Sequence, residues 1–359
     1  MGDGPYLHPV GLLYGKVARA AIGQGDAGAL AGGAIGFPAA RIISGSSSAQ
    51  GQETRSYRDL DQAKEPAIVE TLERLKRPRS RLAGLSFDAP KIMGVVNVTP
   101  DSFSDGGLYD WTEQAISRAA QLTLEGADIV DIGGESTRPG ADPVNSEDEL
   151  ERVLPVIDGL KGSPTRISID TRKARVMVAA ERAGVRMIND VSALTFDPES
   201  MAVVAKCDLP VVLMHAKGDP KTMQDEPVYD DVVLEVYDYL SSRIAACAAA
   251  GISSDRLIAD PGIGFGKRLG HNLELFAGLS LFHGLGVPLM VGASRKSFIG
   301  ALTGERDPLQ RVCGSVAAAL AAMAQGVQLV RVHDVSETAQ ARSVWQAAIS
   351  GKVEVGTKT

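Results

Sequence analysis

The chain has 359 residues, of which 44% are hydrophobic and 23% charged, with a formal net charge of −7. These values are typical of a globular protein, and the acidic balance argues against a surface that binds nucleic acid or anionic membranes. No uncharged run reaches the roughly 18 residues that a transmembrane helix requires, and no basic flank leads into an apolar leader. Cys207, Cys247 and Cys313 are scattered in apolar surroundings and predict reduced thiols. We therefore expect a cytoplasmic protein.

The first part of the chain has an uneven composition. Residues 1–50 are rich in glycine and alanine and predict a small α+β appendage, to which the sequence assigns no function. Residues 51–88 are polar and charged and predict a linker, which contains a short helix over 68–75 and a basic run over 76–81. Residues 89–359 have a far more regular pattern and form the main domain.

From residue 91 onward, a short β-type run alternates with a segment of helical spacing. The runs cover residues 91–98, 127–134, 165–170, 185–190, 209–215, 255–262, 287–294 and 327–334. Several helical segments are followed by a glycine that marks their end, such as Gly184 and Gly251. Strands and helices in alternation predict parallel pairing with right-handed crossovers. Eight units predict a (β/α)₈ TIM barrel with a small N-terminal extension, and the alternative is an open, doubly wound sheet.

The β-type runs end in polar residues, which a barrel would gather at its C-terminal mouth. Asp131, Asp170, Asn189 and Asp260 suit a flat heterocycle with amino, ring N–H and carbonyl groups, because carboxylates accept hydrogen bonds and an amide both donates and accepts. Each of them alone is equally well explained by pairing with a neighbouring Lys or Arg. The four together favour a binding site.

Positive side chains occupy the same loops, although the protein is acidic. They are Arg138, Arg295, Lys296, Arg331 and His333. This set favours an anionic substrate such as a phosphate or pyrophosphate. Asn97 ends the first run and is a candidate ligand for Mg²⁺, which commonly takes few protein ligands together with substrate phosphates. A Schiff base on Lys296 is an alternative that its position in a polar loop disfavours.

Other ligand interpretations are weaker. The five histidines and three cysteines have no zinc-binding spacing. The glycines in residues 262–267 lack the phosphate-loop spacing and are better explained by a tight turn beside Asp260. Phe103, Pro139 and Phe265 are apolar residues of the expected mouth loops, and they are either loop anchors or contacts for an aromatic substrate.

Eight segments in order resemble the dihydropteroate synthase family across residues 91–345. They are NVTPDSFSDGG, GADIVDIGGESTRPGA, ISIDT, MINDVSA, LMHAKGDPKTMQ, DPGIGFGK, GASRKSF and VRVHDV. The resemblance implies a (β/α)₈ barrel that joins 7,8-dihydropterin-6-methyl pyrophosphate to p-aminobenzoate, with release of pyrophosphate. It also implies a Mg²⁺ cofactor, inhibition by sulfonamides that mimic p-aminobenzoate, and a homodimer.

The resemblance further implies a role for each matching residue. The pterin would be held by Asp170, Asn189, Met214, Asp260, Lys296 and Arg331. The pyrophosphate would be held by Asn97 with the metal, and by Thr137, Arg331 and His333. The p-aminobenzoate would be held by Phe103, Pro139, Phe265 and Ser297. Catalysis would depend on Asp101, Lys296, Arg331 and His333, with Asp101 stabilising a pterin methyl cation after pyrophosphate leaves. Residues 99–107 would form a lid.

Two other functions are compatible with parts of this pattern. A methyltransferase that passes a methyl group from methyltetrahydrofolate to a corrinoid protein would share the Asp and Asn grip on the pterin. It would have no use for the cations of SRKSF and VRVHD. A non-catalytic pterin-binding paralogue is the second alternative, and the presence of Asn97, Asp101, Lys296, Arg331 and His333 argues against it.

Overall fold

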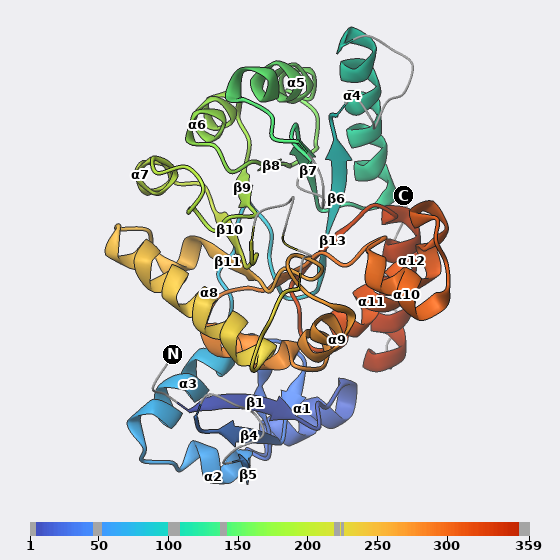
Figure 1. The fold of residues 1–359 in the computed structure, drawn as a ribbon. Coiled ribbons are helices and arrows are strands. Elements are labelled where there is room, and N and C mark those ends of the chain that lie inside the picture. Colours follow the sequence, from blue (N-terminus) through green and yellow to red (C-terminus); the bar gives the residue numbers. More distant parts are fainter. Residues whose placement is uncertain are drawn as a thin grey trace.

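A computed structural model of the chain describes residues 5–45, 52–99, 108–136, 142–218, 223 and 226–351. It contains an eight-stranded sheet surrounded by helices, and a smaller antiparallel sheet that lies to one side of them (Figure 1). The larger unit carries the polar strand ends that the sequence singles out.

All pairings within the larger sheet are parallel. Its strands are β6 (Lys91–Asn97), β7 (Ile129–Gly133), β8 (Ile167–Asp170), β9 (Met187–Asp190), β10 (Val211–Met214), β11 (Leu257–Asp260), β12 (Met290–Val291) and β13 (Leu329–Val332). They follow one another in chain order, and β13 pairs with β6. A parallel bridge between Ala259 and Leu289 joins β11 to β12 and closes the circle. The predicted barrel is confirmed, and the open sheet is excluded.

Helices follow the strands and form the outer layer. They are α4 (Leu108–Glu125), α5 (Ser146–Gly159), α6 (Ala174–Ala183), α7 (Ser200–Lys206), α8 (Val232–Ala249), α9 (Leu269–Ala277), α10 (Ser297–Thr303), α11 (Val312–Ala324) and α12 (Val335–Ser350), with the 3₁₀ turns η3 (Ser254–Arg256), η4 (Leu279–Leu285) and η5 (Pro308–Gln310). Local signals set their limits. The Asp231 side chain accepts hydrogen bonds from the first turn of α8, and Gly184 ends α6 with a φ of 104°.

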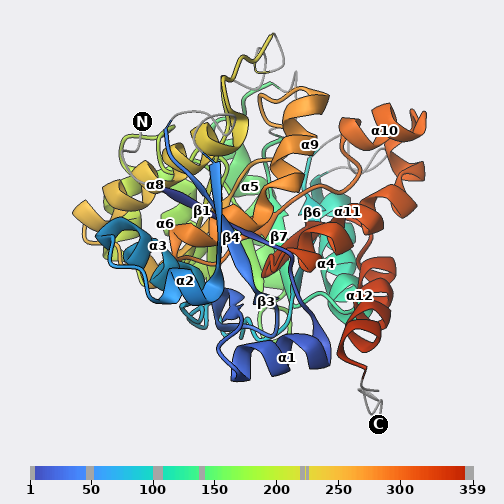
Figure 2. The same cartoon turned by 90° about the horizontal axis from the view of Figure 1, so that it is seen from below.

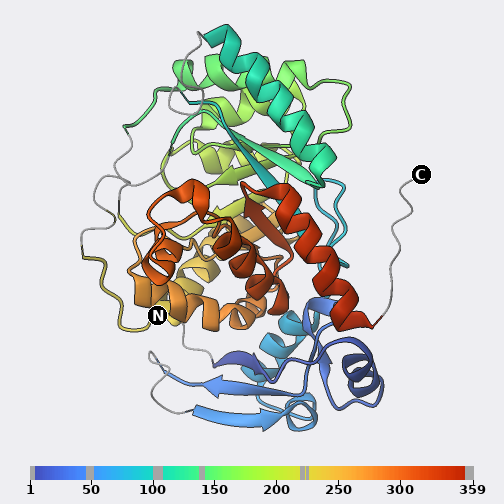
Figure 3. The ribbon, with the colours of Figure 1, turned by 90° about the vertical axis from the view of Figure 1, so that its right-hand side faces the viewer.

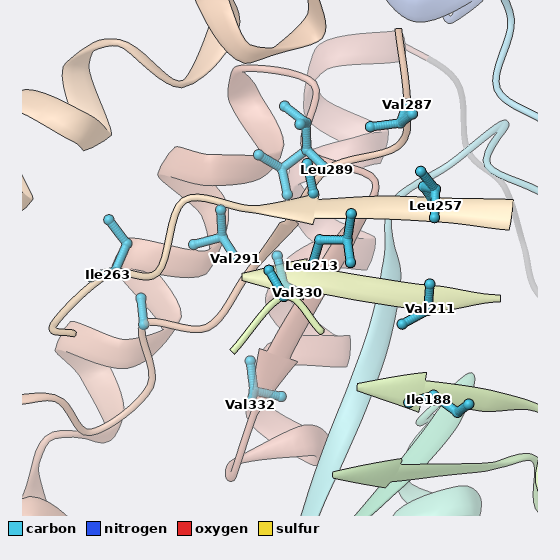
Figure 4. Close-up of a cluster of buried hydrophobic side chains, with 14 of the residues drawn as sticks. Ile188, Val211, Leu213, Leu257, Ile263, Val287, Leu289, Val291, Val330 and Val332 are labelled. Atoms are coloured by element: carbon cyan, nitrogen blue, oxygen red, sulfur yellow. The ribbon is translucent and has the colours of Figure 1, made fainter. Parts of the chain in front are cut away.

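The two faces of each strand differ because successive side chains point to opposite sides. Outward residues are apolar and pack against the helices, as Leu213, Val291 and Val330 do in Figure 4. Inward residues near the strand starts form a separate apolar layer across the bottom of the barrel. This layer contains Met93, Ile129, Met187, Val212, Ile258, Met290 and Leu329, with Leu82 and Leu85 packed against them. Two residues further along several strands, the same face carries a polar side chain, and so the barrel becomes polar toward its C-terminal end.

The N-terminal region is a small α+β unit with its own core. Strands β1 (Tyr6–Val10), β4 (Ala39–Ile43) and β5 (Gln52–Ser56) form an antiparallel sheet in the order β1-β4-β5. The other elements are β2 (Gly28–Ala29), β3 (Gly36–Phe37), α1 (Gly15–Gly23), η1 (Leu30–Gly32), α2 (Tyr57–Asp61) and α3 (Pro66–Lys76). The buried side chains of Leu7, Phe37, Leu60 and Leu75 belong to one cluster that excludes the barrel.

The structure differs from the linker that the sequence predicts over residues 51–88. Strand β5 pairs with β4 in register from Ala39–Ser56 to Ile43–Gln52, so the small sheet crosses the predicted boundary at residue 50. The expected short helix is present as α3, which is amphipathic and buries Leu72 and Leu75. Leu82 and Leu85 form an isolated bridge beneath the barrel. The sequence did not predict most of these elements, because each buries only one face and their overall composition is therefore polar.

This N-terminal unit, residues 5–88, is called the extension below. It packs on the helical layer of the barrel next to α8, η4 and the end of α12 (Figures 1 and 3). The Tyr6 hydroxyl donates to Asp238 Oδ1 at 2.8 Å, and the Tyr14 hydroxyl donates to the Ala324 carbonyl at 2.6 Å. Helix α1 lies beside the C-terminal end of α12 (Figure 2). Within the described ranges, no helix is both long and apolar enough to cross a membrane.

Candidate active site

The site lies at the C-terminal ends of the barrel strands, where the inward positions are polar. Met187 and Asn189 share the inner face of β9, and Ile258 and Asp260 share that of β11. An apolar residue therefore fixes each strand in the barrel core, while the residue two positions later is delivered to the mouth. Both Asn189 and Asp260 are buried there, at 2% and 3% exposure.

Arg331 is the centre of one side of the mouth. Its Nε donates to Asp131 Oδ2 at 2.7 Å, and its Nη2 donates to Asp170 Oδ2 at 2.8 Å. The Asn189 side chain also donates to Asp131 Oδ2, at 2.9 Å. The second oxygen of Asp131 is buried and has no partner among the described residues. The guanidinium thus joins two carboxylates that come from neighbouring strands, β7 and β8.

The carboxyl group of Asp170 is easily protonated in this setting. Burial raises its pKa to about 7, and the carboxylates of Asp131 and Glu149 add to the rise, while Arg331 opposes it. Burial likewise raises the pKa of Asp260. A ligand that donates hydrogen bonds to Asp170 would stabilise its ionised form.

Lys296 lies beyond the end of β12, the strand that pairs with β13. Its ammonium donates to the Ile263 carbonyl and lies 4.5 Å from the centre of the Phe265 ring. Burial lowers the pKa of Lys296 to about 8, although the nearby charge of Asp260 opposes this shift. The amine is bonded to a main-chain oxygen and an aromatic face, and so it is placed for binding.

The loop that presents Ile263 and Phe265 wraps around a second lysine, Lys267. The Lys267 ammonium is buried and donates to the carbonyls of Gly262 and Phe265, both at 2.9 Å, and of His215, at 3.3 Å. His215 Nδ1 lies 2.8 Å from the same nitrogen. Burial lowers the pKa of His215 to about 2, so its ring is neutral.

The glycines of this loop are required by its path. Gly262 has a φ of 67°, and a Cβ there would lie 1.9 Å from the His215 carbonyl oxygen. The predicted tight turn beside Asp260 is therefore present, and Gly262 N donates to Asp260 Oδ1 at 2.7 Å. The sequence did not predict the role of Lys267 in this turn. A lysine that directly follows a glycine-rich loop after a barrel strand was the available signal.

The predicted anion contacts occupy the next strands. The His333 backbone N–H donates to Ser294 Oγ at 3.2 Å, and His333 Nδ1 lies 3.1 Å from the same oxygen. Arg295 is paired with Asp334 and is therefore explained by structure alone. Ser297 begins α10 and is exposed.

Asn97 ends β6 beside β7, in register with Gly133. Its half-buried amide makes no side-chain hydrogen bond within the described part of the chain, which leaves its oxygen available to a cation or ligand. Those same residues contain no cluster of three or more His, Cys, Asp or Glu suited to hold a metal. An ion at Asn97 would need further oxygen ligands from substrate and water, which is the usual arrangement for Mg²⁺.

A buried ion network beside the mouth was not predicted from sequence. Glu135 accepts hydrogen bonds from Arg172 Nε and Nη2, both at 3.1 Å, and from Lys173 Nζ at 2.9 Å. Lys173 also donates to Glu149, and the Val144 backbone N–H donates to Glu135 at 3.0 Å. Arg172 and Lys173 lie two and three residues after the end of β8, so the network fixes the chain close to Asp170. Their spacing along the chain gives no sign of this pairing.

A cavity of about 330 Å³ opens next to Phe265. Arg172 and Phe196 form another part of its wall, where the guanidinium carbon lies 3.7 Å from the ring centre. Met214 is buried at the end of β10, close to the same loops. Four predicted site residues, Asp101, Phe103, Thr137 and Pro139, lie outside the described residues, as do Arg138 and most of the expected lid.

A closed (β/α)₈ barrel with buried carboxylates, Arg331 and Lys296 at its C-terminal mouth defines the class of barrel enzymes whose active site lies at this end. The sequence profile described as pterin binding enzyme matches residues 93–333. A dihydropteroate synthase of Neisseria meningitidis serogroup B is 53% identical over 268 residues, which cover 73% of this chain and 94% of the relative. The chain therefore belongs to the pterin-binding enzyme family, and within it to the dihydropteroate synthases.

Solved structures agree with this assignment. A Xanthomonas albilineans dihydropteroate synthase with 4-aminobenzoic acid has a TM-score of 0.71 and 51% identity, covering 76% of this chain and 98% of that one. A structure of the same enzyme in complex with 7,8-dihydropteroate has a TM-score of 0.69 and 48% identity, with the same coverage. These proteins are covered almost completely, whereas about a quarter of this chain lies outside each match.

Proposed function

We propose that the barrel condenses 7,8-dihydropterin-6-methyl pyrophosphate with p-aminobenzoate to give 7,8-dihydropteroate and pyrophosphate. The observation that carries this proposal is the convergence of Asp170, Asn189, Asp260, Lys296 and Arg331 at one barrel mouth. Its acceptors and donors complement an amino-pyrimidinone edge, and its cations complement a pyrophosphate. The ligands named for the X. albilineans structures are the second substrate and the product of this reaction.

In this proposal the pterin is held by both sides of the mouth. Asp170 and Asp260 accept hydrogen bonds from its amino and ring N–H groups, Asn189 supplies the complementary amide, and Met214 packs nearby. Lys296 donates to the pterin from the β12 side. Arg331 lies against the ring, and because Arg331 donates to Asp170, a pterin that binds Asp170 has to share or replace that ion pair.

The pyrophosphate would be held by Asn97, Arg331 and His333, with Thr137 contributing from outside the described residues. A bound Mg²⁺ at Asn97 would neutralise part of the negative charge that develops on the leaving pyrophosphate. The carbon–oxygen bond breaks with its electron pair on pyrophosphate, and the buried carboxylates, with Asp101, stabilise the pterin methyl cation. The arylamine lone pair then forms the carbon–nitrogen bond, and its proton passes to solvent.

The p-aminobenzoate would bind beside Phe265, with Ser297, Phe103 and Pro139 as further contacts. Support comes from the position of Phe265 over the Lys296 ammonium, which places an aromatic surface next to the proposed pterin site. Sulfonamides that resemble p-aminobenzoate should compete for this position. The corrinoid methyltransferase alternative is disfavoured, because that reaction would have no use for Arg331 and His333 as contacts of an anionic leaving group.

The test is product formation from the two substrates. The purified chain with Mg²⁺ should yield equal amounts of 7,8-dihydropteroate and pyrophosphate, and chelation of the metal should abolish both. Lys296→Met should raise the KM for the pterin substrate at least tenfold. If no dihydropteroate forms with Mg²⁺ present, the proposed function is wrong. A borohydride-trapped adduct on Lys296 would instead support a Schiff-base mechanism.

We also propose that the enzyme acts as a homodimer in the cytoplasm. Leu269, Leu273, Leu302 and Leu309 are exposed large apolar side chains around α9 and α10, and a dimer contact over these helices would remove their apolar surface from water. Sedimentation equilibrium of the full chain distinguishes a dimer from a monomer.

A further inference from the structure

The extension contacts a segment that is separated by four residues from a strand of the proposed active site. This segment is η4, and all seven of its residues are buried. Strand β1 and helix α3 of the extension pack against it. Ser280 Oγ donates to the Pro9 carbonyl at 3.1 Å. Arg79 Nη2 donates to the His283 carbonyl at 2.9 Å, while its Nη1 donates to the Arg74 carbonyl at 3.1 Å. The Arg79 guanidinium thus joins the end of α3 to η4.

The approach of α3 to this segment is close. A Cβ on Gly284 would lie 3.4 Å from Thr71 Cγ2, and a Cβ on Gly286 would lie 3.3 Å from Arg74 Cγ. The ring of Tyr6 packs edge-on against that of Tyr237 with centres 5.3 Å apart, and Tyr237 contacts Phe282 of η4 in turn. The extension therefore contacts η4 through main chain, small residues and aromatic rings.

After η4 and four intervening residues, 286–289, comes β12, which has the shortest pairing among the barrel strands. It pairs with β13 over two residues, Met290 and Val291. Its connection to β11 is the bridge at Leu289, where Ala259 N donates to the Pro288 carbonyl at 2.9 Å. The other neighbouring strands pair over at least three residues. The junction of β11 and β12 is called the seam below, and Figure 4 shows its side chains packed around Leu289 and Val291.

The upper end of the seam carries two residues of the proposed pterin site. Asp260 ends β11, and Lys296 follows β12 by five residues. The Lys296 ammonium reaches across the seam to the Ile263 carbonyl. A shift of β12 along its axis would move this ammonium relative to Asp260, because few ladder hydrogen bonds oppose such a shift.

We propose that the extension is a positioning element for the active site: by holding η4 it fixes the height of β12, and with it the place of Lys296. The inference rests on the proposed role of Lys296 in binding the pterin. It gives a role to residues that precede the family match over residues 93–333. The N. meningitidis relative is covered over 94% of its own length but over 73% of this chain.

The test compares two full-length variants that each remove extension–barrel hydrogen bonds. Arg79→Met removes the bond to η4, and Tyr6→Phe removes the bond to Asp238 on α8 and serves as the control. Arg79→Met should speed amide hydrogen exchange over residues 287–291 at least tenfold. It should also raise the KM for the pterin pyrophosphate three- to tenfold, with kcat within twofold of the parent. Tyr6→Phe should change neither quantity.

Several outcomes would overturn the inference. One is unchanged exchange over residues 287–291 in Arg79→Met, and another is an equal rise in KM in both variants. If Arg79→Met does not fold, Ser280→Ala removes the milder bond to Pro9 and should give the same pattern at smaller size. Lys296→Met in the parent chain separates the two proposals. An unchanged pterin KM there would refute the role of Lys296, while the exchange result would still decide whether the extension holds β12.

Discussion

The two sides of the barrel mouth are built in different ways. On the side of β7, β8 and β13, Arg331 is bonded to the carboxylates of Asp131 and Asp170, so side-chain charges hold one another. On the side of β11 and β12, Lys296 is bonded to the Ile263 carbonyl and faces Phe265, so a loop backbone holds the charge. If the pterin binds as proposed, the first side exchanges ion pairs between side chains for substrate contacts, whereas the second exchanges or shares a bond to a main-chain carbonyl.

Substitutions on the two sides should therefore have different consequences. Removal of a partner on the Arg331 side leaves buried charge uncompensated, which is costly for folding and binding alike. Removal of a partner on the Lys296 side releases a loop, which mainly affects the geometry of the bound substrates.

The largest effect is expected from Arg331→Met. The substitution leaves Asp131 and Asp170 without their cation and should lower kcat/KM by about 10³-fold or more, since an ionic contact to both substrate and protein is lost. Unfolding free energy should fall by about 3–5 kcal/mol. Steady-state kinetics and denaturant melts measure the two effects.

Arg342→Met is the matched control for this substitution. Arg342 is paired with Asp128 at 2.9 Å, with side chains exposed to an extent close to that of Arg331, but it lies at the other end of the barrel near the start of β7. It should lose stability and keep its kinetic constants within about threefold, because it touches no mouth residue. Equal kinetic losses in the two variants would contradict the assignment of Arg331 to the site.

The sequence was sufficient to predict the barrel fold and several of the residues at its mouth. Alternating patterns specify strands and helices locally, and the rule that parallel strand ends meet at one mouth brings Asp170, Asn189, Asp260 and Arg331 together without coordinates. The fold class and these positions therefore needed no knowledge of side-chain contacts.

Other features depend on contacts that distant segments create. Sequence alone cannot show that Arg331 forms ion pairs with Asp131 and Asp170. Nor can it show that Glu135 pairs with Arg172 and Lys173. The position of the Lys267 ammonium among main-chain carbonyls is equally hidden. The extension was harder still, because its short strands bury one face each and its polar composition resembles a linker. Pairing between β4 and β5 is decided by tertiary packing and leaves only a weak local signal.

A smaller loss is expected from Lys267→Met on the loop side. Without the ammonium, the carbonyls of Gly262, Phe265 and His215 lose a buried donor, and the loop should relax away from Lys296. We expect kcat/KM to fall about 10- to 100-fold, chiefly through a higher KM for p-aminobenzoate. Initial-rate kinetics with each substrate varied in turn would detect this split.

Lys217→Met is the control on the same side of the mouth. The Lys217 ammonium lies 4.1 Å from the centre of the Tyr229 ring and is far more exposed than that of Lys267. Its removal should leave both KM values within about twofold. If Lys267→Met lowers thermal stability without any change in KM, the loop contributes to folding alone and the contrast between the two sides is lost.

The smallest effect is expected in the pH dependence of kcat/KM. Each side of the mouth should contribute one limb of this profile, the acid limb from Asp170 and the alkaline limb from Lys296. Burial raises the pKa of Asp170 to about 7, so below that pH its protonated carboxyl loses an acceptor for the pterin. Burial lowers the pKa of Lys296 to about 8, so above that pH its amine loses its charge. The value of kcat/KM for the pterin should therefore pass through a maximum between these two values and fall about fivefold or more by pH 6.

The direction of the Asp170 shift can be checked independently, by stability without substrate. A carboxyl with a pKa of about 7 when folded and 3.8 when unfolded holds its proton more tightly in the folded chain. Its contribution to stability is therefore complete below the unfolded pKa and is lost as the pH rises through about 7. Asp170→Asn should remove both this loss and the acid limb of kcat/KM, while the alkaline limb from Lys296 remains. Burial also raises the pKa of Asp190, to about 6. If an acid limb near pH 6 persists in Asp170→Asn, the titrating group is Asp190 rather than a residue on the Arg331 side.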